Sequence, residues 1–317
     1  MTLPNFIIIG ERRSGTTNLA KWLEAHPEIF IAPQVDKGFF IDDEVNGRRI
    51  WLDGQVDTSK WEEDHNLKDY AAYFEDVTTE IAIGEKSADY LFWTPAHARI
   101  KKNLPDIKLL VILRNPIERA WSMYWNELGK GREDLSFEEA IVVEKERIAK
   151  SDYAKDHLSY ISRGFYDESL AALFKVFNPE KVKVLVLEEC IKNPIAQLKE
   201  VYQFLGVNEE TGFQNVNKKV NANWTLLTRP FWKSNSVLES IERKAYRVIL
   251  LFSKLVYRNN RFKNRKLAIF LARPFRYSKK DVQMKPKTRE KLRKEYKASI
   301  KSLERLLGKD LSIWLKE

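Results

Sequence analysis

The chain is poor in cysteine, glycine and proline, and it has no long hydrophobic run. Its 317 residues include one cysteine, Cys190, with 12 glycines and 11 prolines. A single cysteine excludes an intrachain disulfide and a cysteine-ligated zinc cluster, and it favours a reducing compartment. The low glycine and proline content excludes collagen-like and low-complexity chains. No stretch reaches the roughly 18–20 apolar residues that a membrane-spanning helix needs.

The first residues also lack the features of a secretory signal peptide. The opening Met-Thr-Leu-Pro-Asn has no basic segment and leads into no long apolar stretch. Together with the single cysteine, this favours a cytoplasmic protein. Hydrophobic residues make up 44% of the chain, so its length and composition allow a large core in one α/β domain or two smaller ones.

Positive charge is concentrated in one part of the chain. The formal net charge is +10, yet residues 241–300 alone hold 20 Lys and Arg against 4 Asp and Glu. The remainder of the chain is therefore acidic in sum. A basic block of this kind can face nucleic acid, an anionic lipid surface or an acidic ligand, or it can be the solvated face of helices.

Short apolar runs alternate with helical patterns in the first two thirds of the chain. Four runs are typical of buried strands: residues 5–10, 81–83, 107–113 and 182–187. Helices are expected after the first run, with Leu19, Trp22 and Leu23 on one face, and again at 166–176 and 194–205. This alternation predicts right-handed crossovers and a parallel sheet covered on both faces.

The remaining segments carry other patterns. Residues 36–80 are rich in acidic and aromatic side chains and are expected to form a surface excursion. From about residue 235 onward only helices are expected, the last two near 287–306 and 310–315.

The sequence therefore predicts a single domain over 1–317 with a P-loop-like three-layer α/β fold. Its expected parts are an α/β core with a nucleotide site in 1–206 and a mainly helical, basic C-terminal extension in 207–317.

A loop with phosphate-binding spacing follows the first apolar run. Residues 10–17 read G-x-x-x-x-G-T-T, which is Walker A spacing with Thr16 in place of the lysine. Backbone N–H groups at the start of a helix, with two hydroxyls, still form an anion cradle. The missing lysine, with Arg12 and Arg13 standing earlier in the loop, favours a nucleotide with a shorter anhydride than ATP.

This loop and a second segment resemble the sulfotransferases that use 3′-phosphoadenosine 5′-phosphosulfate (PAPS), in particular the heparan- and glycan-type enzymes and their bacterial relatives. Residues 13–17, Arg-Ser-Gly-Thr-Thr, are similar to the family's first phosphate loop. Arg114, in Leu-Arg-Asn-Pro, and Ser122, eight residues later, resemble its 3′-phosphate site. The two segments are about 100 residues apart and in the family's order.

The resemblance implies a set of nucleotide-binding residues and a donor. The expected nucleotide-binding residues are Arg12, Arg13, Ser14, Gly15, Thr16, Thr17, Asn18, Arg114 and Ser122. The expected donor is PAPS, with PAP (adenosine 3′,5′-bisphosphate) as its product. No metal is implied, and the four histidines have no ligand spacing.

Sulfuryl transfer needs in-line positioning, stabilisation of charge on the leaving phosphate, and a proton acceptor. The resemblance places Arg13 at the 5′-phosphosulfate, where many relatives have Lys. It places Asp36, three residues before Phe39-Phe40, at the position of the base, where heparan-type relatives have Glu. Glu85, in a segment similar to the family's Glu-Lys-(Ser/Thr)-x-x-Tyr, is the alternative base, and Lys86 is expected beside the sulfate and the acceptor. A turn residue is the simpler role for Asp36.

Two other functions remain open at the level of sequence. A P-loop kinase or NTPase fits the loop spacing, but the loop lacks the lysine and the run 107–113 ends in Arg114 rather than in a Walker B acid. A nucleic-acid-binding protein would use the basic block, but no helix-turn-helix, RNA-recognition or zinc signature accompanies it. Nucleic acid is therefore not the expected partner.

The acceptor is expected to be a glycan or glycolipid. The heparan-type resemblance and the aromatic residues of 51–76 favour a sugar, although buried packing is the commoner role of such aromatics. Residues 245–276 combine apolar and basic side chains, so peripheral contact with the cytoplasmic face of a membrane is a further interpretation of this segment.

Overall fold

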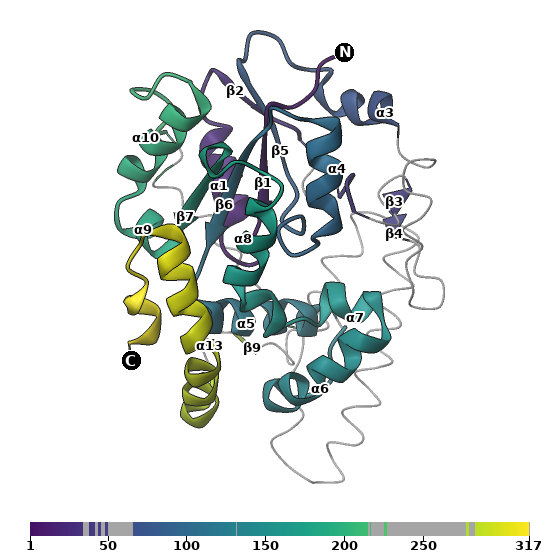
Figure 1. Cartoon of the computed structure of the whole chain (residues 1–317), viewed down its shortest axis with the longest axis vertical. Coiled ribbons are helices and arrows are strands. Elements are labelled where there is room, and N and C mark those ends of the chain that lie inside the picture. Colours follow the sequence, from purple (N-terminus) through teal and green to yellow (C-terminus); the bar gives the residue numbers. More distant parts are fainter. Residues whose placement is uncertain are drawn as a thin grey trace.

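The computed structural model describes residues 1–33, 38–41, 66–130, 132–214, 216 and 283–316, and the backbone of four two-residue strands at 44–45, 48–49, 225–226 and 277–278. Its centre is a five-stranded parallel sheet in the order β2-β5-β1-β6-β7 (Figure 1). The strands are β1 (Phe6–Gly10), β2 (Ile29–Ile31), β5 (Ala82–Lys86), β6 (Lys108–Leu113) and β7 (Val182–Val186).

The sheet forms because its strands are apolar on both faces. Every residue of β1 is buried, as is β6 from Leu109 onward, and continuous apolar runs are typical of parallel strands covered on both sides. Strand β1 pairs with β5 from Phe6–Gly84 to Ile8–Lys86 and with β6 on its other edge. The phosphate loop after β1 therefore starts at the middle of the sheet.

Helices cover both faces, and the predicted three-layer α/β fold is confirmed. On one face lie α4 (Pro95–Asn103), α5 (Pro116–Gly129), α8 (Tyr166–Phe174) and α13 (Pro286–Leu307). On the other face lie α1 (Thr16–Leu23), α9 (Leu187–Lys192) and α10 (Pro194–Leu205). Side chains alternate along β1, so Ile7 packs in the first layer and Ile8 in the second.

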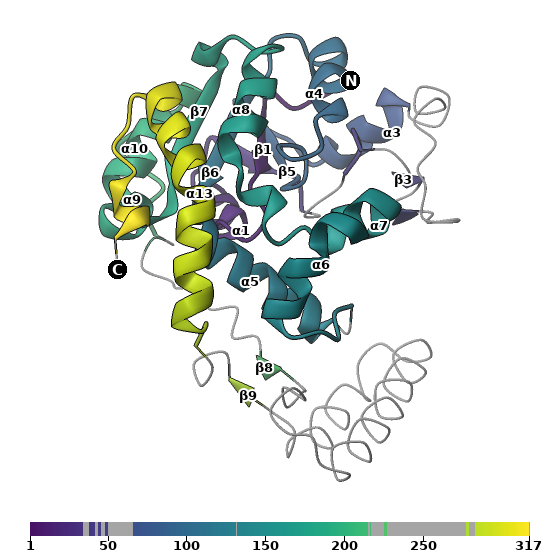
Figure 2. The ribbon, with the colours of Figure 1, turned by 60° about the horizontal axis from the view of Figure 1, so that its bottom comes forward.

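Shorter elements complete the described part of the chain. Helices α6 (Phe137–Lys150) and α7 (Asp152–His157) lie together beside α5, while α13 runs along α8 toward α5 (Figure 2). Helix α3 (Leu67–Ala71) precedes β5. Two-residue strands β3 (Glu44–Val45) and β4 (Arg48–Arg49) pair with each other, as do β8 (Thr225–Leu226) and β9 (Tyr277–Ser278). Short 3-10 turns occupy Ala72–Phe74, Ser162–Gly164, Pro179–Lys181 and Ser312–Leu315.

Local sequence signals explain where several helices begin and end. Asn115 caps α5 by accepting from the N–H of Ile117 at 3.0 Å, and Pro116 occupies the first turn, where its missing N–H costs nothing. Ser136 and Glu139 form a capping box at the start of α6. Gly206 ends α10 with φ of +86°.

Three strands of the structure differ from the sequence predictions. Strand β5 begins and ends later than the expected 81–83 because β1 pairs with Gly84–Lys86, so Glu85 and Lys86 lie on the strand rather than after it. Strand β2 was not expected at all. The expectation of no strand beyond residue 235 is wrong for β9.

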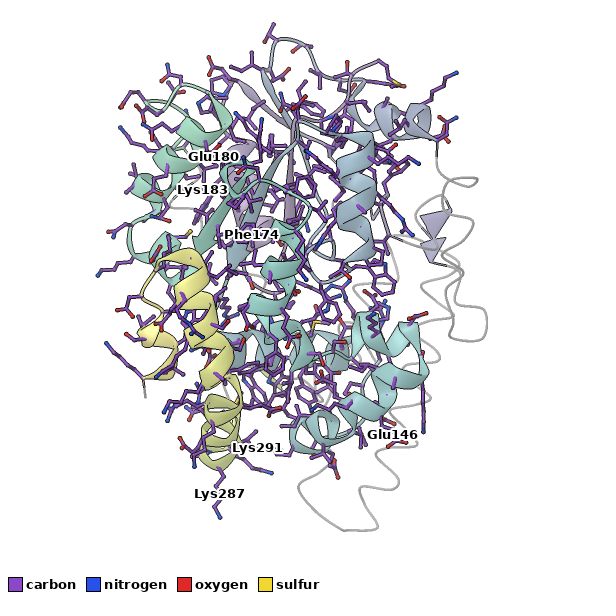
Figure 3. All side chains as sticks on the ribbon, in the orientation of Figure 1. Glu146, Phe174, Glu180, Lys183, Lys287 and Lys291 are labelled. Carbon is purple, nitrogen blue, oxygen red and sulfur yellow. The ribbon has the colours of Figure 1, made fainter. Side chains whose placement is uncertain are left out.

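The C-terminal helix packs on the α/β core through one apolar face. Leu292, Tyr296 and Ile300 are buried, and the Tyr296 hydroxyl donates to the Ile161 carbonyl at 2.8 Å. The opposite face is basic, and Figure 3 shows Lys287 and Lys291 pointing outward from one end of α13. For residues 283–300, therefore, the solvated helical face is the observed role of the charge.

Most of the basic block lies elsewhere. Residues 241–276 and 279–282, including the 245–276 segment expected to contact a membrane, lie outside the described residues. Among the helices that the structure does describe, none combines the length and apolar character needed to cross a bilayer. The division of the domain at residue 206 stays a prediction.

Candidate active site

The loop between β1 and α1 is shaped by left-handed backbone at two positions. Arg13 has φ of +73° and Gly15, the N-cap of α1, has φ of +101°. Only glycine adopts the latter conformation without strain, and a Cβ on Gly15 would lie 2.8 Å from Leu187 Cδ1. These turns direct the loop around the N-terminus of α1, where the first backbone N–H groups have no intrahelical partner.

The two predicted phosphate-binding segments meet at this loop. Arg13 Nε donates to Ser122 Oγ on α5 at 3.3 Å, and Arg114 Nη1 donates to the Arg13 carbonyl at 3.4 Å. Tyr166 steadies the second segment by donating its hydroxyl hydrogen to the Arg114 carbonyl at 2.9 Å. The structure thus brings Arg13, Arg114 and Ser122 to the carboxyl edge of the sheet, where α/β folds bind ligands.

The electrostatics of this edge favour an anion. Burial, and then the neighbouring Arg114 guanidinium, lower the pKa of Arg13 to about 10, so Arg13 stays protonated at neutral pH. Like charges held close together disfavour each other's ionised form. An anion between them would relieve that cost.

The other loop residues differ in exposure. Ser14 and Thr16 are buried, Thr17 is exposed, and Asn18 is half-buried on α1. Arg12 is also half-buried, and its guanidinium contacts the carboxylates of Asp89 and Asp156, the latter at 3.2 Å. Burial acts to lower the pKa of Arg12, but these carboxylates raise it above its ordinary value. Nucleotide contacts of all the predicted binding residues, Arg13, Gly15, Arg114 and Ser122 included, stay predictions.

Glu85 is fully buried at the end of β5 and accepts three hydroxyl hydrogen bonds. Oε1 accepts from Tyr70 at 2.9 Å and from Tyr90 at 3.2 Å, and Oε2 accepts from Ser87 at 3.1 Å. Burial and the Glu85 carboxylate raise the pKa of Tyr70 well above its ordinary value. Lys86, next in the strand, is 2% exposed.

The same hydroxyls hold the segment that follows the predicted base. Ser87 Oγ accepts from the N–H of Gly38 at 3.1 Å, and the Tyr90 oxygen accepts from the N–H of Phe40 at 3.3 Å. The ring of Phe39 stacks on Tyr70 with 4.5 Å between centroids. Asp36 itself lies outside the described residues, but the chain two residues later is fixed beside Glu85 and Lys86.

Sequence reasoning missed Asn126. Its Oδ1 accepts from Arg13 Nη1 at 3.3 Å. Asn126 stands one helical turn after Ser122 on α5, so the i, i+4 spacing was a usable signal. The turn that carries Arg114 is also tied to the C-terminal part of the chain, because Asn115 Nδ2 donates to the Trp314 carbonyl at 3.2 Å.

Among the residues with described side chains, no group of three His, Cys, Asp or Glu could hold a metal ion. The arrangement instead suits a ligand with more than one anionic group. Arg13, Arg114 and Ser122 supply two cations and a hydroxyl close to one another, next to the N-terminus of α1. Such groups stabilise charge that develops on a leaving oxygen.

Curated relatives of the chain are sulfotransferases. Human heparan sulfate glucosamine 3-O-sulfotransferase 5 is 29% identical over 208 residues, which cover 65% of this chain and 54% of the relative. Human heparan sulfate glucosamine 3-O-sulfotransferase 3B1 is 27% identical over 213 residues, covering 65% of this chain and 46% of the relative. The human bifunctional heparan sulfate N-deacetylase/N-sulfotransferase 3 is 28% identical over 210 residues, covering 65% and 22%. The chain thus matches about half or less of these proteins.

A solved structure agrees with the fold. The sulfotransferase from Alicyclobacillus acidocaldarius superposes with a TM-score of 0.67 and 24% identity, covering 100% of both chains. The sequence profile of the sulfotransferase family matches residues 4–211, which include both phosphate-binding segments. Because this match covers well over half of the chain, the chain belongs to the sulfotransferase family.

Proposed function

We propose that the protein transfers the sulfuryl group of PAPS to a hydroxyl or amine of a glycan or glycolipid, releasing PAP. The observation that carries the proposal is the meeting of Arg13, Arg114 and Ser122 beside the N-terminus of α1, because two cations and a hydroxyl placed together suit the anionic groups of PAPS. The heparan sulfate relatives support a sugar acceptor. Cytoplasmic localisation and membrane contact through 245–276 stay predictions.

In this mechanism the residues of the chain divide the work of one displacement. The acceptor oxygen or nitrogen forms a bond to sulfur as the bond between sulfur and the bridging phosphate oxygen breaks, and that electron pair leaves on PAP. Arg13 and the N–H groups of the loop stabilise the leaving phosphate. Asp36 takes the acceptor proton, and Lys86 holds the transferring group and the acceptor in line.

Acceptor screening with radiolabelled PAPS tests the proposal. Label is expected to move to a heparan-type polysaccharide or to a glycolipid, but not to a small phenol. Thermal unfolding with nucleotides tests the donor separately, because a ligand that binds only the folded state raises Tm. PAP is expected to raise Tm further at each higher concentration, approximately with the logarithm of the concentration above Kd, and Mg-ATP to have little effect. Stabilisation by Mg-ATP and none by PAP would favour a P-loop kinase or NTPase.

The two segments should contribute to nucleotide affinity by different amounts. Ser122→Ala is expected to weaken PAP binding about tenfold, as one hydrogen bond from a neutral hydroxyl is lost, and Arg114→Ala by about tenfold to a hundredfold, as a contact between a cation and an anion is lost. Calorimetric titration with PAP measures both. Arg305→Ala, at an exposed position near the end of α13, removes a cation of the same type and should leave the affinity unchanged. Equal affinity in all three variants would contradict the assignment.

A further inference from the structure

Five charged side chains form a buried ion cluster behind the phosphate loop: Glu11, Arg12, Asp89, Asp156 and Arg163. Their side chains range from fully buried, for Glu11, to 20% exposed, for Arg12. None of the roles in sulfuryl transfer uses Asp89, Asp156 or Arg163. Burial of this many charges costs free energy of folding unless they are paired. The stability of the cluster therefore depends on how its charges are paired.

Arg12 contacts two carboxylates of the cluster, and Arg163 contacts all three, including Asp156 Oδ1 at 3.4 Å. Arg163 Nη1 lies 2.9 Å from Glu11 Oε1, and Arg163 Nη2 lies 2.8 Å from Asp89 Oδ1. The other oxygen of Asp89 contacts Arg12, whose Nη2 is also 3.2 Å from Asp156 Oδ1. Asp89 therefore bridges the two arginines, and the planar fork of each guanidinium fixes the geometry in a way that a lysine ammonium does not.

The cluster connects the phosphate loop to distant parts of the chain. Glu11 and Arg12 belong to the loop, Asp89 follows β5, and Asp156 lies on α7. The backbone is held as well, because Glu11 Oε1 accepts from the N–H of Arg12 at 2.8 Å and Arg12 Nη1 donates to the Asp156 carbonyl at 2.9 Å. The loop residues just before Arg13 are thus fixed by contacts from three other segments: the turn after β5, α7 and the 3-10 turn that carries Arg163.

The charges distinguish Arg12 from Arg13. The cluster holds three carboxylates and two guanidiniums, so the positive charge of Arg12 is compensated where it stands. A phosphate that approached the Arg12 guanidinium would also approach Asp89 and Asp156. After burial, Arg114 has the largest effect on the pKa of Arg13 and lowers it, more than the Glu127 carboxylate raises it, and a site where cations prevail is favourable to an anion.

We propose that Arg12 is a positioning residue rather than a phosphate ligand, and that the buried ion cluster holds the loop so that Arg13 faces Arg114 and Ser122. The inference rests on the proposed function for its ligand, PAP. It assigns to Asp156, a residue of α7 outside both phosphate-binding segments, a part in nucleotide affinity. Displacement of a catalytic group by about 1 Å can cost a hundredfold in rate, which makes such a support consequential.

Asp156→Asn and Arg12→Lys separate positioning from direct contact. If Arg12 positions the loop, both variants weaken PAP binding, by about tenfold, and both lower kcat at saturating PAPS because Arg13 is misplaced. If Arg12 binds phosphate directly, Arg12→Lys keeps the charge and most of the affinity, and Asp156→Asn leaves PAP binding unchanged or tighter because a nearby negative charge is removed. Calorimetric titration with PAP on the full chain distinguishes the two.

A double variant adds a second discriminating measurement. When two residues act in one network, their effects are not additive, so the Kd of Arg12→Lys/Asp156→Asn should be close to that of the weaker single variant. Multiplication of the two single effects would overturn the proposal. If Asp156→Asn does not fold, Arg12→Lys, at the partly exposed edge of the cluster, still distinguishes the two roles. Loss of PAP affinity in this variant supports positioning, and retention supports direct contact with phosphate.

Three controls complete the experiment. Asp106→Asn makes the same chemical change at an exposed position before β6 and should leave the Kd unchanged. Val201→Ala lowers stability in the opposite layer of the fold, so a Kd that rises in this variant as well would mean a general effect of destabilisation and would overturn the positioning role. Failure of the unmodified protein to bind PAP would contradict the proposed function itself, which is a different result from PAP binding that is insensitive to Asp156→Asn.

Discussion

Arg12 and Arg13 are neighbours in the chain with opposite electrostatic surroundings. Burial and Arg114 lower the pKa of Arg13 to about 10, whereas carboxylates raise that of Arg12 against the effect of burial. The two side chains have different partners: Arg12 contacts Asp89 and Asp156, whereas Arg13 donates to Ser122 and Asn126. Two arginines one position apart can therefore have different roles: in the proposal above, Arg13 binds the ligand and Arg12 positions the loop.

The role of Asp36 as the general base is the assignment of a single residue that most needs a test. Asp36→Asn is expected to lower kcat by about a hundredfold or more, the range for loss of a general base, with little change in PAP affinity. Stopped assays with PAPS and the identified acceptor measure kcat across pH, and the acidic limb of the profile should disappear in the variant.

Glu85→Gln is the matched comparison. Both oxygens of Glu85 accept hydroxyl hydrogen bonds in a fully buried position, so we expect this variant to lower Tm and to keep the shape of the pH profile. Near-normal turnover of Asp36→Asn, with loss of the acidic limb in Glu85→Gln, would transfer the role of base to Glu85.

At the scale of elements, the docking of α13 depends on the absence of a side chain at Gly164. A Cβ there would lie 2.5 Å from the Tyr296 hydroxyl oxygen and 2.7 Å from ring carbons. Gly164→Ala is therefore expected to destabilise the protein by about 1–3 kcal/mol, the usual cost of overpacking. Denaturant unfolding measures it.

Tyr296→Phe serves as the control for this contact. It removes only the hydrogen bond to Ile161 and should cost about 1 kcal/mol. A smaller cost for Gly164→Ala than for Tyr296→Phe would show that α13 shifts easily and that the contact is not tight.

The elements that could be predicted were those with a strong local signal. The apolar runs of β1, β6 and β7 and the regular spacing of α10 and α13 determined their type, because each buries a continuous face. Strand β2 escaped prediction because it has only three residues and directly follows a helix end and Pro27. The later position of β5 depends on its register with β1, which no local pattern encodes.

The residues of the candidate site also differ in whether the sequence alone could predict them. Arg114 and Ser122 were predictable because the chain keeps both on one strand–turn–helix segment with the family's spacing. The partners of Arg12 were not, since Asp89 and Asp156 are 77 and 144 residues away and look like ordinary surface acids in the sequence. Only the fold brings them behind the loop.

At the scale of the whole molecule, His97 should make a contribution to stability that is lost on mild acidification. Burial lowers the pKa of His97 to about 4, below its ordinary 6.5, and keeps the ring neutral against the Tyr90 carbonyl. Between pH 6.5 and about 4, His97 is protonated in the unfolded chain but stays neutral in the folded protein. The free energy of unfolding is therefore undiminished above pH 6.5 and falls as the pH drops toward 4, by up to about 3 kcal/mol for this residue.

Urea unfolding of the protein and of His97→Gln at several pH values measures this contribution. The glutamine amide can still donate to the Tyr90 carbonyl but does not titrate, so the difference in unfolding free energy between the two proteins should shrink or reverse as the pH falls. A difference that is independent of pH between 7 and about 4 would contradict the buried neutral state of His97.

The central place of β1 in the sheet has a consequence for synthesis of the chain. Strand β1 is flanked in the finished fold by β5 and β6, which are translated much later. Until then its apolar residues have no partners, a situation in which nascent chains need chaperones to avoid association. Pairing over such sequence distances is slow. The proposed nucleotide site is therefore complete only after α5, which carries Ser122, has been translated and has packed against the sheet.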